Sequence, residues 1–259
     1  MKRLLIALTA VAALTGSALA ADMAPRYTKA PMPMPVAPSW TGFYIFGGFG
    51  GGLWDSAGHV QTLNGLPLTI DAKTGGDGWY GTVGAGYDWQ FNSSWVFGIF
   101  GDGQFGSIKG TIQDQNIFSQ GQIKLQDSWA AGARLGYLVA PNVLSYVNAG
   151  YSGSHWSGTT LLNTFSGLPV GLSTAGFNRN GVFVGGGVEN NLNIFGITAP
   201  GWFMKTEYRA AYYNKKTIAE TFANGVVFGD TMTFQPLVQT ISTSLVYRFN
   251  WTGPVVAKY

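Results

Sequence analysis

The sequence predicts an all-β fold: an eight-stranded antiparallel transmembrane β-barrel of the up-and-down type. The first observation behind this prediction is the segment at residues 202–213 (WFMKTEYRAAYY), where apolar or aromatic positions alternate with positions that include Lys205, Glu207 and Arg209. Successive side chains of a strand point to opposite faces, so this strand has one apolar and one charged face. Most other strand-length segments also have an apolar face, and no helix is predicted to cover it. Lipid is the solvent that accepts such a surface.

The second observation is that long and short connections alternate along the chain. Apolar alternation predicts strands near residues 40–55, 78–91, 95–111, 127–140, 143–158, 178–190, 202–218 and 235–251. Two connections, at 92–94 and 141–142, are tight turns, and the one at 191–201 is longer than a tight turn. The others are long and rich in Gly, Asn, Ser and Thr: 56–77, 112–126, 159–177 and 219–234. This pattern is typical of an outer-membrane barrel, which closes because lipid cannot satisfy open sheet edges.

The third observation is the placement of the nine tryptophans. One group is predicted at the strand ends nearest the short turns or the termini: Trp40, Trp89, Trp95, Trp202 and Trp251. The other group is predicted at the opposite ends: Trp54, Trp79, Trp129 and Trp156. We therefore expect all nine to lie near two aromatic girdles at the membrane interfaces. A soluble β-sandwich, the alternative fold, would scatter or bury some of them.

The two ends of the chain are predicted to lie outside the barrel, which we place at residues 40–251. Residues 1–20 predict a secretory signal peptide, with a basic start, an apolar stretch and a small-residue cleavage site. Its apolar stretch is shorter than the roughly 20 residues of a membrane-spanning helix. Residues 21–39 predict a proline-rich periplasmic spacer, and residues 252–259 a short periplasmic tail. The expected location is the cell outer membrane of a Gram-negative bacterium.

Composition excludes several classes of protein. Removal of the signal leaves thirteen basic against twelve acidic residues, so the basic character of the precursor predicts no nucleic-acid partner. Charged residues make up only 10% of the chain, which is too few for a disordered protein. The absence of cysteine excludes disulfides, thiolate zinc sites and a cysteine nucleophile. We expect neither a metal nor a cofactor.

Inward-facing charges are the candidate functional residues. An eight-stranded barrel is just wide enough inside for its own side chains, and buried charges are tolerated when they are paired. We expect Asp102 to face Arg134, and Glu207 to face Arg248, on neighbouring strands. The inward polar set comprises Asp88, Asp102, Gln104, Arg134, Glu189, Lys205, Glu207, Arg209 and Arg248. The favoured interpretation is a structural polar plug, and the alternative is an ion-conducting path.

Other motifs give weaker signals. The glycine runs at 47–52 and 185–187 open no helix after a strand, so they favour close packing inside a narrow barrel over a phosphate cradle. Ser154 and Ser157 flank His155, but adjacent strand residues point apart and no carboxylate lies nearby, so we predict no catalytic residue. Haem capture by His59 or His155 stays open as an alternative, although two isolated histidines form no motif.

Three segments carry a resemblance to a known family: residues 39–44 (SWTGFY), 205–209 (KTEYR) and 245–249 (LVYRF). With the proline-rich lead, they make the chain similar to the small alphaproteobacterial outer-membrane immunogenic or surface-antigen proteins. The resemblance implies an eight-stranded barrel like the membrane domain of OmpA, surface-exposed antigenic loops and no catalytic residues, and haem binding is attributed to some members. Family members usually end on the aromatic residue of the final strand, whereas this chain continues to Tyr259. The insertion signal is therefore either residues 247–249 or Tyr259.

These observations together predict a non-enzymatic structural protein that contributes to envelope integrity and displays its loops outside the cell. The alternatives are a narrow porin and a haem-binding surface protein. The expected partners are outer-membrane lipid and lipopolysaccharide, and the barrel-assembly machinery during insertion. The sequence predicts no particular ligand for the loops.

Overall fold

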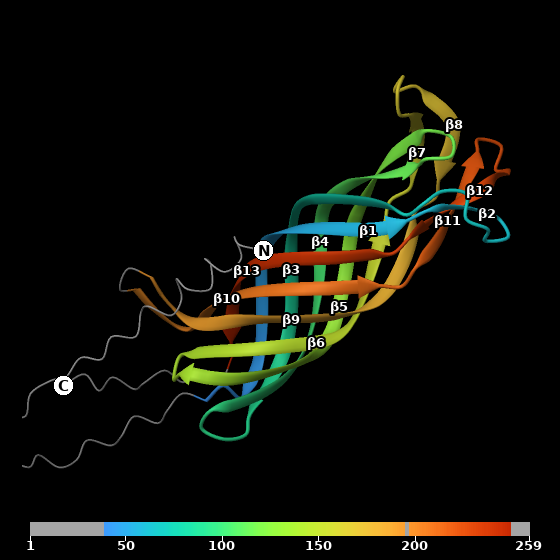
Figure 1. Cartoon of the computed structure of the whole chain (residues 1–259). Coiled ribbons are helices and arrows are strands. Elements are labelled where there is room, and N and C mark those ends of the chain that lie inside the picture. The colour runs from blue at the N-terminus through green and yellow to red at the C-terminus, as the bar shows by residue number, and fades with distance from the viewer. Residues whose placement is uncertain (1–38, 195–196, 250–259) are drawn as a thin grey trace, which may run out of the picture. The chain divides into compact units, whose positions relative to one another are not determined.

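Eight long strands form the wall of a barrel (Figure 1). This computed structural model describes residues 39–194 and 197–249, so the predicted signal peptide, almost all of the spacer, the tail and Trp251 lie outside the described residues. The wall strands are β1 (Gly42–Gly58), β3 (Ala72–Gln90), β4 (Trp95–Asp114), β5 (Ser119–Ala140), β6 (Val143–Trp156), β9 (Phe177–Ile194), β10 (Ile197–Tyr213) and β13 (Pro236–Arg248).

The wall closes on itself. Each wall strand pairs antiparallel with the next one along the chain, and β13 returns to pair with β1. A closed ring leaves no open sheet edge along the wall, as lipid requires. The predicted all-β, eight-stranded antiparallel barrel is therefore confirmed. No helix within the described residues is long and apolar enough to cross a membrane.

Side chains of the wall alternate between the two faces as the sequence pattern predicts. In β10, Trp202, Tyr208 and Tyr212 are exposed, whereas Phe203 and Arg209 are buried. The exposed positions of the other wall strands are also largely apolar or aromatic, so the outward surface suits lipid and the packed core occupies the interior.

The outer connections are folded into sheet, where the sequence predicts irregular loops. β4 and β5 continue as a hairpin to Asp114 and from Ser119, across most of the connection expected at 112–126. Five short strands form within or beside the other outer connections: β2 (Val60–Thr62), β7 (Thr159–Asn163), β8 (Pro169–Thr174), β11 (Lys216–Phe222) and β12 (Val227–Phe234). The prediction of loops was wrong because a strand that has left the lipid no longer carries the apolar outward face that marks the spanning strands.

The connection expected at 191–201 is mostly paired strand. β9 ends at Ile194 and β10 begins at Ile197, and the register shifts between Thr198 and Phe203. Thr198 pairs with Asn193 and Phe203 with Asn191, so three extra residues of β10 are accommodated in an irregularity. Gly201 lies within it at a φ of 81°, a left-handed conformation that glycine adopts without a Cβ clash. The length of this connection therefore correctly indicated an irregularity. It did not indicate that β9 and β10 continue as paired strands through the same residues.

Three tryptophans do not join the predicted girdles. Trp79, Trp89, Trp95, Trp129 and Trp202 are exposed on the outside of the barrel. Trp40, Trp54 and Trp156 are instead 0–1% exposed and belong to the core. Trp54 and Trp156 lie on strands that extend beyond the span, where the interior still needs filling, so tryptophan position along a strand did not determine its face.

Candidate functional site in the barrel interior

Two arginines and two carboxylates form a closed ring of ion pairs at the level nearer the short turns. Arg134 of β5 lies 2.5 Å from Asp88 of β3 (Nη2 to Oδ2) and 3.1 Å from Glu189 of β9 (Nη1 to Oε2). Arg248 of β13 lies 2.8 Å from Asp88 (Nη1 to Oδ2) and 2.7 Å from Glu189 (Nη2 to Oε1). All four side chains are buried. Each charge in this four-residue ring has two opposite charges as neighbours, which compensates its removal from water.

The ring is possible because its members come from alternate strands of the wall. Inward side chains of every second tilted strand lie at a common level in a barrel of this size. A glycine makes room for one member: at Gly98 of β4, a Cβ would collide with the carboxylate of Asp88. Tyr44 of β1 completes the packing, with its ring centroid 4.4 Å from Cζ of Arg134 and 4.9 Å from Cζ of Arg248. These cation–π contacts hold both guanidinium groups in place.

A second group of charges, the Arg209 cluster, lies farther toward the outer end and comprises Asp102, Tyr146, Lys205, Glu207 and Arg209. Arg209 binds Asp102 through two hydrogen bonds of 3.0 and 2.7 Å, and its Nη2 lies 2.7 Å from Oε1 of Glu207. The other oxygen of Glu207 accepts a 2.8 Å hydrogen bond from the hydroxyl of Tyr146 and lies 3.6 Å from Nζ of Lys205. The strands that supply this cluster, β4, β6 and β10, alternate with those of the four-residue ring.

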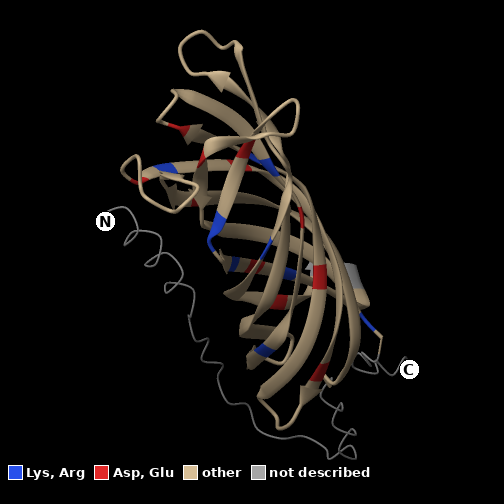
Figure 2. Ribbon diagram, turned by 90° about the vertical axis from the view of Figure 1, so that its right-hand side faces the viewer, with Lys and Arg blue, Asp and Glu red and all other residues tan. Residues whose placement is uncertain are grey.

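Aromatic rings pack against the cations of the Arg209 cluster. Nζ of Lys205 lies 3.4 Å from the ring centroid of Phe46, and Cζ of Arg209 lies 4.6 Å from that of Phe183. In the ring and the cluster together, four cations face four carboxylates, so their formal charges balance. Figure 2 shows charged residues as blue and red bands on the wall strands. The interior at this level is a neutral, tightly paired layer and not a surface of one sign.

The structure buries all eight charged residues of the predicted inward set, but it does not pair them as the strand order suggested. Asp102 binds Arg209 and not Arg134, because Asp102 lies opposite Ala130 in the register and Arg134 lies opposite Gly98. Four residues of offset separate side chains by about 13 Å along a strand. The expected pair of Glu207 and Arg248 is excluded by a similar offset: Glu207 lies opposite Ser242, six residues from Arg248.

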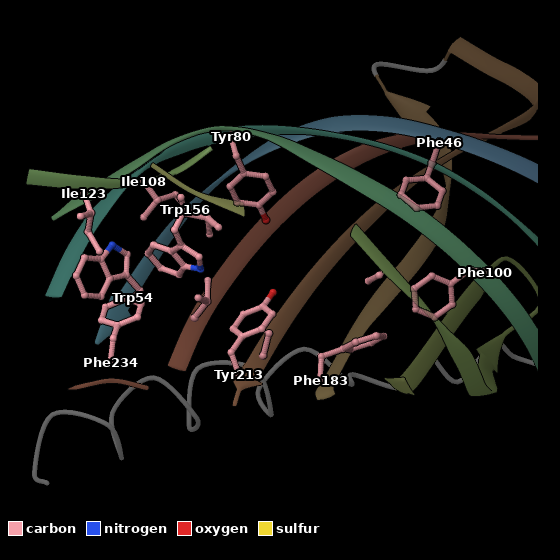
Figure 3. Packing of buried hydrophobic residues seen from close by; sticks show 14 of the residues in the cluster. Phe46, Trp54, Tyr80, Phe100, Ile108, Ile123, Trp156, Phe183, Tyr213 and Phe234 are labelled. Atoms are coloured by element: carbon pink, nitrogen blue, oxygen red, sulfur yellow. The ribbon is translucent and has the colours of Figure 1, made fainter. Parts of the chain in front are cut away.

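The aromatic cap, defined as Trp54, Trp156, Phe177 and Phe234, fills the interior toward the outer end. Ring centroids of Trp54 and Trp156 are 5.4 Å apart, and Phe234 lies 5.4 and 5.0 Å from them. Figure 3 shows Trp54, Trp156 and Phe234 grouped at one end of the packed interior. Tyr80 and Tyr213 lie between this group and Phe46, Phe100 and Phe183. The interior therefore carries an apolar layer above the two charged layers.

The two histidines do not form a common site. His59 lies just after β1, with Nδ1 2.7 Å from Oδ1 of Asp71, and His155 lies on β6, with Nδ1 2.5 Å from Oδ1 of Asn178. β1 and β6 are on opposite sides of the eight-strand ring, so the imidazoles cannot meet on one haem. Ser154 points inward and accepts a 3.0 Å hydrogen bond from Nε1 of Trp156, while His155 is partly exposed. No hydrogen bond joins Ser154 or Ser157 to His155.

Sequence reasoning missed the aromatic partners of the interior charges. Tyr44, Phe46, Tyr146 and Phe183 all occupy inward positions of their strands, and the alternation that marked the charges also marked them. Their role depends on which strands lie across the interior, which the sequence pattern does not define.

A closed, lipid-facing barrel with a packed and neutralised interior defines an integral outer-membrane β-barrel protein. The chain belongs to the family described as outer membrane protein beta-barrel domain, which it matches over residues 6–249. The match places the protein in the outer membrane and agrees with the resemblance to alphaproteobacterial surface antigens.

Individual proteins are similar to this chain over most of its length. The 31 kDa outer-membrane immunogenic protein of Brucella melitensis is 28% identical over 217 residues, which cover 79% of this chain and 84% of the relative. The 25 kDa outer-membrane immunogenic protein of Brucella abortus is 27% identical over 255 residues, which cover 96% and 99%. Among solved structures, the outer membrane protein OprG of Pseudomonas aeruginosa is similar at 12% identity and a TM-score of 0.48, covering 81% of this chain and 97% of that one.

Proposed function

We propose that this protein is a non-enzymatic structural barrel that contributes to envelope integrity, seals its own interior and displays its outer segments at the cell surface. The observation that carries the proposal is the balanced interior charge. A path that selects ions by charge carries rings of one sign along a water-filled lumen. Here, four cations and four carboxylates neutralise one another in the four-residue ring and the Arg209 cluster, beneath the aromatic cap.

The apolar outward surface supports a role in contact with lipid. Exposed tryptophans and tyrosines near the ends of the spanning strands suit the interfacial regions of a bilayer, where their rings are both apolar and polar. Outer-membrane lipid and lipopolysaccharide are therefore the proposed partners of the wall. The distribution of Ser154, Ser157 and His155 supports the non-enzymatic part of the proposal, because these three side chains form no nucleophile–base pair.

The test is conductance in planar lipid bilayers, with wild type, Arg134→Ala and Lys109→Ala compared. Wild type should show no steady channels, because the charged layers and the aromatic cap fill the interior. Arg134→Ala removes one member of the four-residue ring and should introduce leak currents, whereas Lys109→Ala, which removes an exposed cation of β4, should stay silent. Steady wild-type channels whose ion preference changes in Arg134→Ala would establish the narrow porin instead.

A cellular experiment tests the envelope role. Deletion of the gene should increase sensitivity to detergents, because a lipid-facing, sealed barrel supports the continuity of the membrane. Expression of wild type should restore resistance. If the deletion strain resists detergent as well as its parent, the barrel has no role in envelope integrity.

A further inference from the structure

Three carboxylates meet beyond the spanning part of the barrel, in its outer segments. Asp114 ends β4, Glu220 lies in β11 and Asp230 lies in β12, and all three are 0–2% exposed. One carboxylate oxygen of each lies within 4.8 Å of the others. We refer to Asp114, Glu220 and Asp230 as the acidic triad. None of its members belongs to the interior charge network.

The acidic triad lacks compensating partners. Oδ1 of Asp114 accepts hydrogen bonds from the backbone N–H groups of Asn116 and Ile117, and Oδ2 of Asp230 accepts one of 2.8 Å from the amide of Asn116. Both carboxylate oxygens of Glu220, a fully buried side chain, have no hydrogen-bond partner, nor have Oδ2 of Asp114 and Oδ1 of Asp230. Within the described residues, no lysine, arginine or histidine forms an ion pair with the triad.

Burying three carboxylates together costs free energy unless a positively charged group binds among them. A buried carboxylate is stable when it is paired with a cation, bound to a metal or protonated. The unpartnered oxygens of Glu220 point to a missing positive charge at the centre of the triad.

All four outer connections converge on the triad. Asp114 and Ser119 close the hairpin of β4 and β5, and Ser119 pairs with Asn163 of β7. Glu220 pairs with Thr174 of β8, and Asp230 pairs with Thr62 of β2. Glu220 lies where the register of β11 and β12 shifts, and at that point its backbone pairs with β8 and not with β12. A group bound here touches residues from two connections and is one strand away from the other two.

We propose that the acidic triad binds a divalent cation, Ca²⁺, which joins the outer segments to one another. The oxygens fit Ca²⁺ in kind and spacing. For three atoms within 4.8 Å of one another, a point exists within about 2.8 Å of all three, close to the Ca²⁺–oxygen distances of about 2.3–2.6 Å. Mg²⁺ requires about 2.0–2.1 Å in strict octahedral geometry, so the wider, three-carboxylate arrangement favours the larger ion.

The cation gives the outer segments a common anchor. The connections between β10 and β13 and between β4 and β5 are otherwise held by short ladders and by packing. A cation shared by β4, β11 and β12 opposes their separation, so binding should rigidify the cell-surface end while it leaves the spanning wall unchanged. The inference is independent of the proposed structural role, because a sealed barrel needs no cation at this position.

The experiment is isothermal titration of CaCl₂ into the refolded full chain, stripped with EDTA and held in a non-ionic detergent free of lipopolysaccharide. Wild type should bind Ca²⁺ at one saturable site. Glu220→Gln and Asp230→Asn should each lose that binding, and Asp77→Asn, which removes an exposed carboxylate of β3, should keep it. Heat-modifiable migration on a gel verifies that each variant is folded, and the near-isosteric amides remove charge repulsion from the triad, so folding should persist.

A second measurement, the rate of trypsin cleavage, tests whether Ca²⁺ rigidifies the outer segments. Trypsin cleavage after Lys215, between β10 and β11, should slow on addition of Ca²⁺ in wild type and in Asp77→Asn but not in Glu220→Gln. Absence of saturable binding to folded wild type, or equal binding by wild type and Glu220→Gln, would overturn the proposal. Binding of Mg²⁺ with equal or greater affinity would overturn the assignment to Ca²⁺.

Discussion

Asp88 shows how a single residue can hold together a barrel interior that has no continuous apolar core at that level. Its two oxygens bind Arg134, and one of them also lies 2.8 Å from Arg248, so one carboxylate offsets much of the charge of two arginines. A buried ion pair contributes little net stability when its cost of dehydration is included, but removal of one partner leaves an uncompensated charge. The four-residue ring is therefore sensitive to the loss of either carboxylate, Asp88 or Glu189, because both arginines share each of them.

We expect Asp88→Asn to lower the free energy of unfolding by about 3–5 kcal/mol, because Arg134 and Arg248 then share only Glu189 as a charged partner. Asp77→Asn, at an exposed position of the same strand, should change it by less than about 0.5 kcal/mol. Urea unfolding in lipid vesicles, followed by tryptophan fluorescence, measures both. A loss below about 1 kcal/mol in Asp88→Asn would mean that Arg134 and Arg248 find other partners or water.

At the scale of elements, the sequence predicts most of the spanning wall and little of what lies outside it. Alternation identified β4 and β5 within the membrane because lipid forces one face to be apolar. Past the membrane the same strands face water, and the polar residues at 112–126 read as a loop although they continue the hairpin to Asp114 and Ser119. Acidic residues in such segments resemble solvated loop charges, so no local pattern indicates that Asp114, Glu220 and Asp230 are buried together.

The inward position of the charged residues was predictable from the sequence, but the pairing between them was not. Alternation along one strand defines which face Asp102 and Arg209 occupy. Their contact, however, joins β4 to β10, which are not neighbours in the wall. Contacts across the interior depend on the tilt and stagger of all eight strands together, and these quantities leave no local pattern in the sequence.

The contact between lipid and the outward face of a wall strand can be tested by comparing a residue on that face with a similarly exposed residue outside the wall. Val147 of β6 and Val226, in the turn between β11 and β12, are 63% and 56% exposed. We expect Val147→Arg to lower the free energy of unfolding in lipid vesicles by about 2–4 kcal/mol, because its charge enters hydrocarbon. Val226→Arg should have little effect, because its charge stays in water. Equal effects of the two substitutions in urea unfolding would contradict the assignment of Val147 to the lipid-facing surface.

At the scale of the whole molecule, the protein separates three environments along the barrel. The four-residue ring and the Arg209 cluster fill the spanning interior, the aromatic cap lies above them, and the acidic triad lies among the outer segments. The basic residues differ in exposure along the barrel. Those of the spanning interior are buried: Arg134, Lys205, Arg209 and Arg248. Lys215, between β10 and β11, is exposed. Because a protease needs an accessible, unpaired segment, this division predicts where the folded protein can be cut.

We expect trypsin added to intact cells to cleave first after Lys215, because β10 ends at Tyr213 and β11 begins at Lys216, so the residue belongs to neither ladder. Lys73 and Lys109 are also exposed but lie within paired strands, and they should be cut more slowly. Mass spectrometry of the fragments identifies the sites, with boiled protein as the control in which Arg134 and Arg209 are also cut, and Lys215→Gln as the control for the first cut. Early cleavage after Arg134 or Arg209 in unboiled protein would contradict the packed interior. Cleavage after Lys215 only in lysed cells would mean that the long connections face the periplasm, which inverts the orientation of the barrel.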